Sequence, residues 1–215
     1  VPANQAKELL RVPGVVAVQQ DALNKKLTDS SPEFVDAPPV WSTLGGQSTA
    51  GSGVLFADLD SGVWPEHPSF AGNPDLPAKP TRPGGGTIDC NFGDNPLTPE
   101  VDPFPCNNKL AGGAGFLETY NSVQDPETFG DTARDSDGHG TAVAMVAAGA
   151  PNSGPAGTIT GMAPKAWLGN YRIFGNPDIH PSTTDDLIIM ALEQALEDGM
   201  DVAVLSLGGP AFTGP

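Results

Sequence analysis

Two short segments carry side-chain types that together perform proton-transfer chemistry. Residues 60–62 read Asp-Ser-Gly after an apolar run, and residues 137–141 read Asp-Gly-His-Gly-Thr before a run of small residues. An aspartate that orients a histidine, and a histidine that acts as general base, are two parts of a Ser-His-Asp charge system. Neither a Gly-Thr-Ser nor a Gly-x-Ser-x-Gly nucleophile turn occurs among the 215 residues. We therefore predict that Asp60 and His139 are catalytic and that their serine lies in sequence beyond Pro215.

The elements around these two residues would position them suitably. The apolar residues 53–60 run without alternation, which is typical of a strand buried on both faces of a parallel sheet. Reactive groups in such sheets gather at the carboxyl ends of the strands, where Asp60 stands. His139 begins a predicted helix, whose positive dipole end disfavours the imidazolium and so favours the neutral base.

Strands and helices alternate through the second half of the chain. Residues 166–174 and 201–207 are predicted strands, and residues 182–199 form a helix capped by Ser182 or Thr183. Such alternation predicts an α/β fold with a parallel sheet flanked by helices. Residues 21–52 read as an irregular polar arm, and residues 72–135 read mostly as loop.

Composition excludes two classes of partner. The net charge is -16 with only 10 Lys and Arg, whereas phosphate binding needs basic side chains. No window approaches the roughly 18 apolar residues of a membrane span. We therefore expect neither a nucleic acid nor a membrane as partner.

Two cysteines lie sixteen positions apart, in a segment rich in proline and glycine. Neither Cys90 nor Cys106 has the Cys-x-x-Cys spacing or the neighbouring histidine of a metal site. A disulfide is favoured over two unrelated free thiols, and it would imply an oxidising compartment.

Acidic residues raise the question of a cation. Asp58 precedes Asp60 by two positions, so both carboxylates lie on one face of the strand. Because like charges this close repel each other, the pKa of one of the two carboxyls should be raised. Asp58 is either a buried, hydrogen-bonded carboxyl or part of a cation site. We expect no cofactor, although structural calcium remains a hypothesis for the acidic loops, which contain Asp94, Glu100, Asp102, Asp125, Glu127 and Asp131.

Five ordered segments resemble the subtilisin-like serine peptidases, especially the large secreted branch with plant cucumisin-like enzymes and bacterial relatives. Residues 59–70 are similar to the catalytic-aspartate block and residues 134–141 to the catalytic-histidine block. The others are residues 106–110 (Cys-Asn-Asn-Lys-Leu), 161–164 (Gly-Met-Ala-Pro) and 206–209 (Ser-Leu-Gly-Gly). In the family, the cysteine of the first of these three is disulfide-bonded.

The resemblance implies a secreted serine endopeptidase with peptide or protein substrates. It implies that Ser206, Leu207, Gly208 and Gly209 line the S1 pocket and pair with the substrate backbone. A catalytically inactive relative that binds peptides is the alternative. The 215 residues alone would be inactive, and the remaining C-terminal part of the catalytic domain would be their partner.

The resemblance also divides the chain. Residues 1–28 resemble the C-terminal part of an inhibitory propeptide, and residues 29–215 the N-terminal part of the catalytic domain. We expect a secretory leader upstream of Val1 and cleavage between about Thr28 and Ser31. The basic pair Lys25-Lys26 is an alternative cleavage site.

Overall fold

The mostly apolar run that ends in Asp60 forms an inner strand of a parallel sheet. The computed structural model describes residue 8 and residues 11–15, 31–118, 130–154, 157–178 and 181–208. Within these ranges a four-stranded sheet has the order β2-β5-β1-β6, and each neighbouring pair is parallel. Its strands are β1 (Leu55–Asp60), β2 (Leu110–Gly115), β5 (Trp167–Arg172) and β6 (Val202–Val204). The predicted fold class, a parallel sheet flanked by helices, is confirmed.

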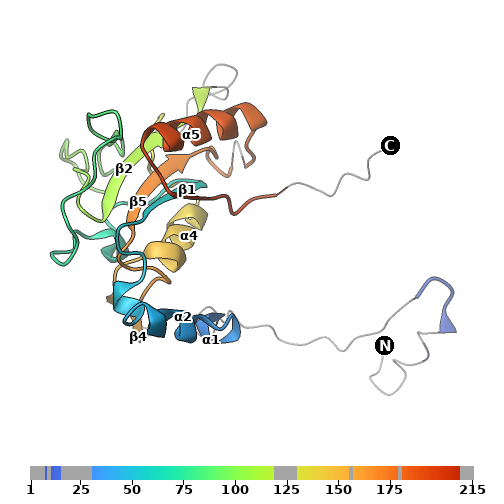
Figure 1. Cartoon of the computed structure of the whole chain (residues 1–215). Helices are drawn as coiled ribbons and strands as arrows, with labels where there is room; N and C mark the ends of the chain where they lie inside the picture. The colour runs from blue at the N-terminus through green and yellow to red at the C-terminus, as the bar shows by residue number, and fades with distance from the viewer. Residues whose placement is uncertain are drawn as a thin grey trace.

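One helix covers each face of the sheet (Figure 1). On one face, Phe56 and Leu168 pack with Ala144 and Ala148 of α4 (His139–Ala148). On the other face, Ala57, Leu59 and Tyr171 pack with α5 (Asp185–Glu197). Since neighbouring side chains of a strand point to opposite faces, β1 contributes to both apolar layers and places Asp58 and Asp60 on the α4 face.

The prediction of mostly loop for residues 72–135 missed strand β2. Its sequence Leu-Ala-Gly-Gly-Ala-Gly lacks the β-branched and aromatic residues that mark strands. Tertiary packing requires the glycines, because a Cβ on Gly112 would lie 2.1 Å from Ile88 and one on Gly113 would lie 2.4 Å from Phe92. Neighbouring segments therefore pack directly on the backbone of this strand.

The arm predicted for residues 21–52 is partly helical where it is described. It contains α1 (Ser31–Phe34), α2 (Ala37–Thr43) and the 3-10 turn η2 (Gln47–Thr49). Pro38 and Pro39 lie in the first turn of α2, where a missing N–H breaks no helical bond. Trp41 Nε1 donates to Met162 O at 3.0 Å and Gln47 Nε2 donates to Gly161 O at 3.0 Å, so this arm is bound to the rest of the fold.

The capping prediction for the helix before β6 was wrong. Helix α5 begins at Asp185, and its N-cap is Thr184, whose side chain makes no capping bond. Asp185 and Asp186 occupy the first turn, where negative charge stabilises the helix dipole. Strands β1, β5 and β6 are each shorter than their predicted runs, because their hydrogen-bonded ladders end earlier.

The remaining described elements are small. They are the 3-10 turn η3 (Pro68–Phe70) and an antiparallel pair made of β3 (Asn152–Gly154) and β4 (Gly157–Ile159). Within residues 1–28, which resemble the end of a propeptide, the structure describes only residue 8 and residues 11–15. Among the helices that the structure describes, none is both long enough and apolar enough to cross a membrane.

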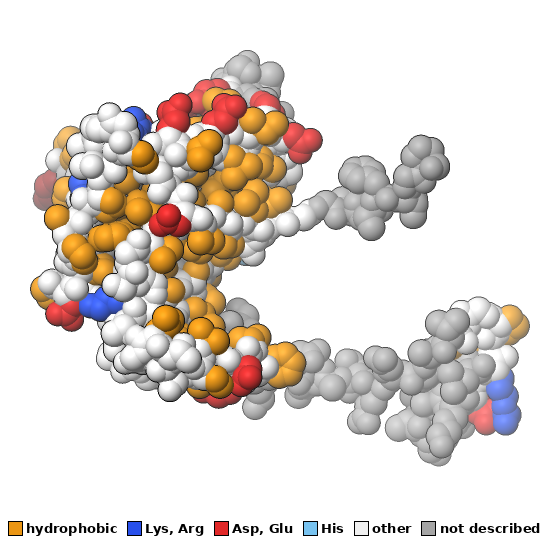
Figure 2. Space-filling model, in the orientation of Figure 1, with side chains coloured by type: hydrophobic (Ala, Val, Ile, Leu, Met, Phe, Trp, Pro, Cys, Tyr) orange, Lys and Arg blue, Asp and Glu red, His pale blue; other side chains and the backbone are white. Residues whose placement is uncertain are grey.

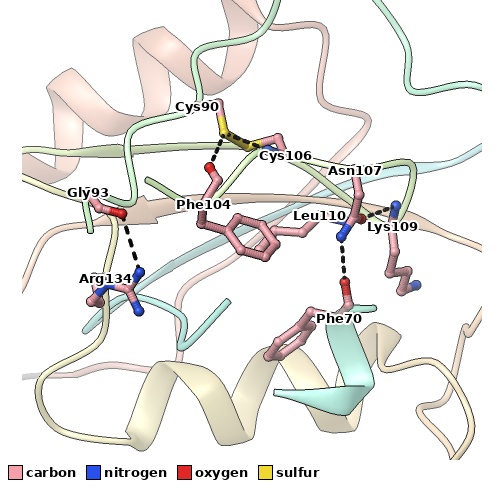
Figure 3. Close-up of a disulfide and its surroundings, with 9 residues drawn as sticks. All are labelled: Phe70, Cys90, Gly93, Phe104, Cys106, Asn107, Lys109, Leu110 and Arg134. Atoms are coloured by element: carbon pink, nitrogen blue, oxygen red, sulfur yellow. Dashed lines mark hydrogen bonds between the residues drawn. A yellow bond between two sulfur atoms is a disulfide. The ribbon is translucent and has the colours of Figure 1, made fainter. Parts of the chain in front are cut away.

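A disulfide joins Cys90 to Cys106, with their Cα atoms 5.8 Å apart (Figure 3). It connects the segment beside Gly113 of β2 to the loop that leads into β2. In the same loop, Asn107 donates from Nδ2 to Phe70 O at 3.0 Å and accepts from the N–H groups of Lys109 and Leu110. These contacts hold the long loop against the sheet.

Hydrophobic side chains remain exposed along α5 and β6. Ile189 is 55% exposed, Leu196 77% and Val202 47%. Figure 2 shows hydrophobic side chains gathered over this side of the molecule, with acidic side chains along its upper rim. Strand β6 forms the sheet edge on this side within the described residues.

Candidate active site

A sharp turn after β1 holds Asp60 at the carboxyl end of the strand. Asp60 is fully buried, and the N–H of Ser61 donates to its Oδ1 at 2.7 Å. Gly62 has φ 109°, and a Cβ there would lie 2.8 Å from Ala133 O. Only glycine combines this backbone conformation with so close an approach to residues 133–135.

The N-terminus of α4 places His139 beside that carboxylate. His139 is the first residue of the helix and follows the N-cap Gly138. A Cβ on Gly140 would lie 2.3 Å from Gly62 O and 3.0 Å from Asp60 Cβ, so glycine permits the approach. His139 Nδ1 lies 2.7 Å from Asp60 Oδ1. With Nδ1–H as the donor, Nε2 is the nitrogen that accepts a proton.

Asp135 fixes this helix start, and it was not predicted from the sequence. Its carboxylate accepts the Ser61 hydroxyl at 2.9 Å, the N–H groups of Asp137 and Gly138 at 2.9 Å, and both the N–H and the hydroxyl of Thr141. Ser61 Oγ in turn accepts the Gly140 N–H at 2.9 Å. An aspartate four positions before the predicted first helical residue was the available signal, since carboxylates satisfy the free N–H groups of helix starts.

An ion pair between buried Arg134 and the more exposed Glu66 connects the two sequence segments. Arg134 donates to both carboxylate oxygens of Glu66, at 2.7 and 2.9 Å, and from Nε to Phe92 O at 3.0 Å. Its guanidinium also lies 4.9 Å from the centre of the Trp64 ring. This bidentate pair holds the turn after Asp60 against the segment before His139.

The electrostatics favour proton uptake by His139. Its hydrogen bond to Asp60 raises the pKa of the imidazole above its ordinary 6.5, burial opposes this rise, and the charges of Asp60, Asp137 and Asp135 add to it. The side chain is 52% exposed, so its free nitrogen is accessible.

A cleft of about 300 Å³ lies over this pair. Asp60, His139, Ser206, Leu207 and Gly208 all line it, so it brings together five residues that were predicted from the sequence. Gly209 lies outside the described residues. Other lining residues were not predicted, and they include Ser61, Asp137, Phe174, Pro177 and Pro181.

Asp58 is buried, but the described residues provide none of the hydrogen bonds expected for its carboxyl. Its side chain is 0% exposed, and neither carboxylate oxygen receives a hydrogen bond from the residues that the structure describes. The described ranges also contain no group of three or more His, Cys, Asp or Glu side chains placed to hold a metal ion. Of the acidic residues considered for calcium, Asp125 and Glu127 lie outside those ranges.

Comparison with known proteins agrees with this geometry. The subtilase family, peptidase S8, matches residues 51–214. The subtilisin-like proteases SBT2.5 and SBT1.5 of Arabidopsis thaliana are each 34% identical to the chain, over 97% and 96% of its length. The chain spans about a quarter of the length of these relatives, 25% and 26% respectively. The match over most of the chain, together with the parallel sheet, shows that this chain belongs to the subtilase family.

Proposed function

We propose that the full-length protein is a secreted serine endopeptidase that hydrolyses peptide bonds through an Asp-His-Ser triad. The observation that carries this proposal is the 2.7 Å contact between His139 Nδ1 and Asp60 Oδ1 at the edge of a cleft. A buried carboxylate on Nδ1 fixes the tautomer whose Nε2 acts as general base. The two Arabidopsis relatives are named subtilisin-like proteases, which supports the same activity.

The serine would come from sequence outside these 215 residues. His139 Nε2 would take the proton of its hydroxyl as the oxygen attacks the substrate carbonyl, and would then give that proton to the leaving amine. Water would hydrolyse the resulting acyl-enzyme with the same base. Asp60 would remain ionised and stabilise the imidazolium in both steps.

The substrate would lie along residues 206–209. Ser206, Leu207 and Gly208 line the same cleft as His139, and all three are exposed. An extended peptide would pair with this backbone as an added strand and place its carbonyl beside the base.

Secretion and a propeptide belong to the same proposal. The disulfide between Cys90 and Cys106 is typical of proteins folded in an oxidising compartment. Residues 1–28 would act as the end of an inhibitory propeptide, and cleavage near Thr28 to Ser31 would separate them from the catalytic domain. N-terminal sequencing of the secreted protein tests this boundary, and a mature chain beginning at Val1 or earlier would contradict it.

A serine-directed fluorophosphonate probe tests the activity itself. We expect the purified full-length protein to be labelled, and His139→Ala to lose labelling with a fall in kcat/KM of about 10⁴- to 10⁶-fold. His67→Asn is the matched control, because His67 does not line the cleft and asparagine can still accept the Ser69 N–H. A full-length protein that binds peptides but is never labelled would favour the inactive relative.

The pH profile supplies a second test. Only neutral His139 acts as a base, so kcat/KM should fall as the pH drops through its raised pKa, which lies above the ordinary 6.5. An acid limb that His139→Ala leaves unchanged would contradict the assignment of this residue as the base.

A further inference from the structure

Four buried oxygens gather on the α4 face of the sheet without a donor. They are Asp58 Oδ1, Asp58 Oδ2, Asp60 Oδ2 and Asn170 Oδ1, and none receives a hydrogen bond from the described residues. Asp58 and Asp60 lie two positions apart on β1, which places their side chains on the same face. Asn170 lies opposite Asp58 in the register with β5, so its side chain shares that face.

Three nearby donors have other acceptors: the Asn170 amide, the Ser61 N–H and His139 Nδ1. Asn170 Nδ2 donates to Ala133 O at 2.8 Å, while Asn170 Oδ1 is buried and receives no hydrogen bond from the described residues. Both the Ser61 N–H and His139 Nδ1 meet Asp60 at Oδ1 and not at Oδ2. Val204 lies opposite Asp58 on β6 and offers no polar side chain.

A proton on one carboxyl gives two of these four oxygens a partner, since one becomes a donor and another accepts from it. Buried polar groups are nearly always hydrogen-bonded, and a buried carboxylate without donors takes up a proton instead of remaining ionised. Protonation turns one acceptor oxygen into a donor. Asp60 already accepts two hydrogen bonds, whereas Asp58 accepts none from the described residues, so Asp58 is the better site for the proton.

The surrounding charges favour the same assignment. Burial raises the pKa of Asp58 well above its usual range, and the negative charges of Asp60 and Asp135 raise it further. Two cationic or titratable groups also surround this face. His139 lies at the start of α4, and Arg172 lies opposite Asp60 on β5 with its guanidinium donating to Phe174 O and Ser136 Oγ.

We propose that Asp58 is a positioning residue, held as a neutral carboxylic acid whose O–H donates to Asp60 Oδ2. Two residues along a strand are separated by about 6.6 Å, a distance that two aspartate side chains leaning toward each other span. With Oδ2 occupied, Asp60 presents Oδ1 to His139 in a single orientation. The donor also disperses the charge of Asp60 and so limits how strongly Asp60 stabilises the imidazolium. This role rests on the proposed function of Asp60 and His139.

Two substitutions of Asp58 in the full-length enzyme test the proposal. Asp58→Asn keeps a donor, so we expect kcat within about twofold of wild type and an unmoved acid limb. Asp58→Val removes the donor, so we expect kcat to fall about tenfold at unchanged KM, with the acid limb about half a pH unit higher. Asp94→Asn, which changes an exposed aspartate away from the cleft, is the matched control.

Contrary results are equally clear. If Asp58 were ionised, alone or with a bound cation, both substitutions would remove a negative charge and move the acid limb downward. If the Asp58 O–H donated to Asn170 instead of Asp60, or if Asp58 only filled space in the core, neither substitution would move the acid limb of the pH profile. Either pattern would overturn the proposal.

Infrared difference spectroscopy reports on Asp58 independently of activity. The spectrum of wild type minus Asp58→Asn, at neutral pH, should contain the C=O band of a protonated carboxyl, and its absence would overturn the proposal. If wild type hydrolyses no peptide, the proposed function fails, while the infrared band still decides whether Asp58 is protonated.

Discussion

Two buried aspartates, one at the C-terminal end of α5 and one on β1 beneath α4, have opposite surroundings. Asp198 follows α5 and is 2% exposed, and it accepts Arg82 Nε at 2.6 Å, the Tyr171 hydroxyl at 2.8 Å and Gln194 Nε2 at 3.1 Å. Asp58 lies on β1 under α4, is 0% exposed, and accepts no hydrogen bond from the described residues.

This difference separates a structural carboxylate from one beside a candidate catalytic pair. A buried charge is stable where donors surround it, as at Asp198, and there it ties α5 to β5 and to the loop that carries Arg82. A carboxyl without donors is tolerated only in its neutral form. We therefore expect changes at the two positions to have opposite effects on stability. In every unfolding experiment, all proteins carry His139→Ala to prevent self-digestion.

The largest effect is expected at Asp198. Asp198→Ala leaves the Tyr171 hydroxyl buried without its acceptor and Arg82 without its buried partner. We expect the free energy of unfolding to fall by about 3 kcal/mol. The fall is no larger because Arg82 remains partly exposed, so that water replaces part of the lost pairing. Denaturant titration of the full-length protein measures this change. A loss below about 1 kcal/mol would show that the donors around Asp198 add little stability, and it would contradict the contrast drawn with Asp58.

A gain that grows with pH is expected at Asp58. Its pKa is raised in the folded state, so the folded protein keeps a proton that the unfolded chain releases above its ordinary value of 3.8. The stability from this proton is therefore complete at low pH and declines as the pH rises toward the folded-state pKa. Relative to wild type, Asp58→Asn should gain about 1.4 kcal/mol per pH unit above about pH 5. Unfolding at several pH values measures the slope, and a constant difference would indicate that Asp58 is ionised.

Lys109 extends the comparison to a buried cation. Its Nζ donates to Pro164 O at 3.0 Å and to Ala166 O at 2.6 Å, and burial, with a smaller contribution from Lys165, lowers its pKa from 10.5 to about 8. Between about pH 8 and pH 10.5, this lysine is protonated in the unfolded chain but largely neutral in the folded protein. The free energy of unfolding of wild type should therefore rise with pH relative to that of Lys109→Met, by at most about 1.4 kcal/mol per pH unit. Equal slopes for the two proteins in unfolding experiments would show that Lys109 does not titrate in this window.

The smallest effect is expected at Tyr171. Tyr171→Phe removes one of the three donors to Asp198 and leaves the other two in place. Because one hydrogen bond contributes about 1 kcal/mol net, we expect a loss of that size in a denaturant titration. A loss as large as that of Asp198→Ala would mean that the hydroxyl alone supports the carboxylate.

The local sequence pattern was sufficient to predict the two candidate catalytic residues, which lie at the end of a strand and at the start of a helix. The apolar run before Asp60 predicted β1, the small residues after His139 predicted α4, and the alternation of later segments predicted a parallel α/β fold. These features depend on residues close in sequence, where periodicity and turn chemistry act directly. The capping prediction at Ser182 or Thr183 failed because neighbouring residues of similar type compete for one cap position.

Other features depend on contacts between distant segments. Strand β2 is glycine-rich because Ile88 and Phe92 pack on its backbone, which no local propensity encodes. Asp198 and Arg82 are 116 positions apart and meet only when α5 packs against the sheet.

By itself, the sequence determined the family, the fold class and the two candidate catalytic residues, since each is a matter of residue type and order. Only the tertiary structure decided which buried groups have partners. Strand register brings Asn170 opposite Asp58, and the packing of α4 brings Asp135 to Ser61 and His139 to Asp60. The physical reason is that a buried charge depends on the donors around it, and those donors come from other strands and helices.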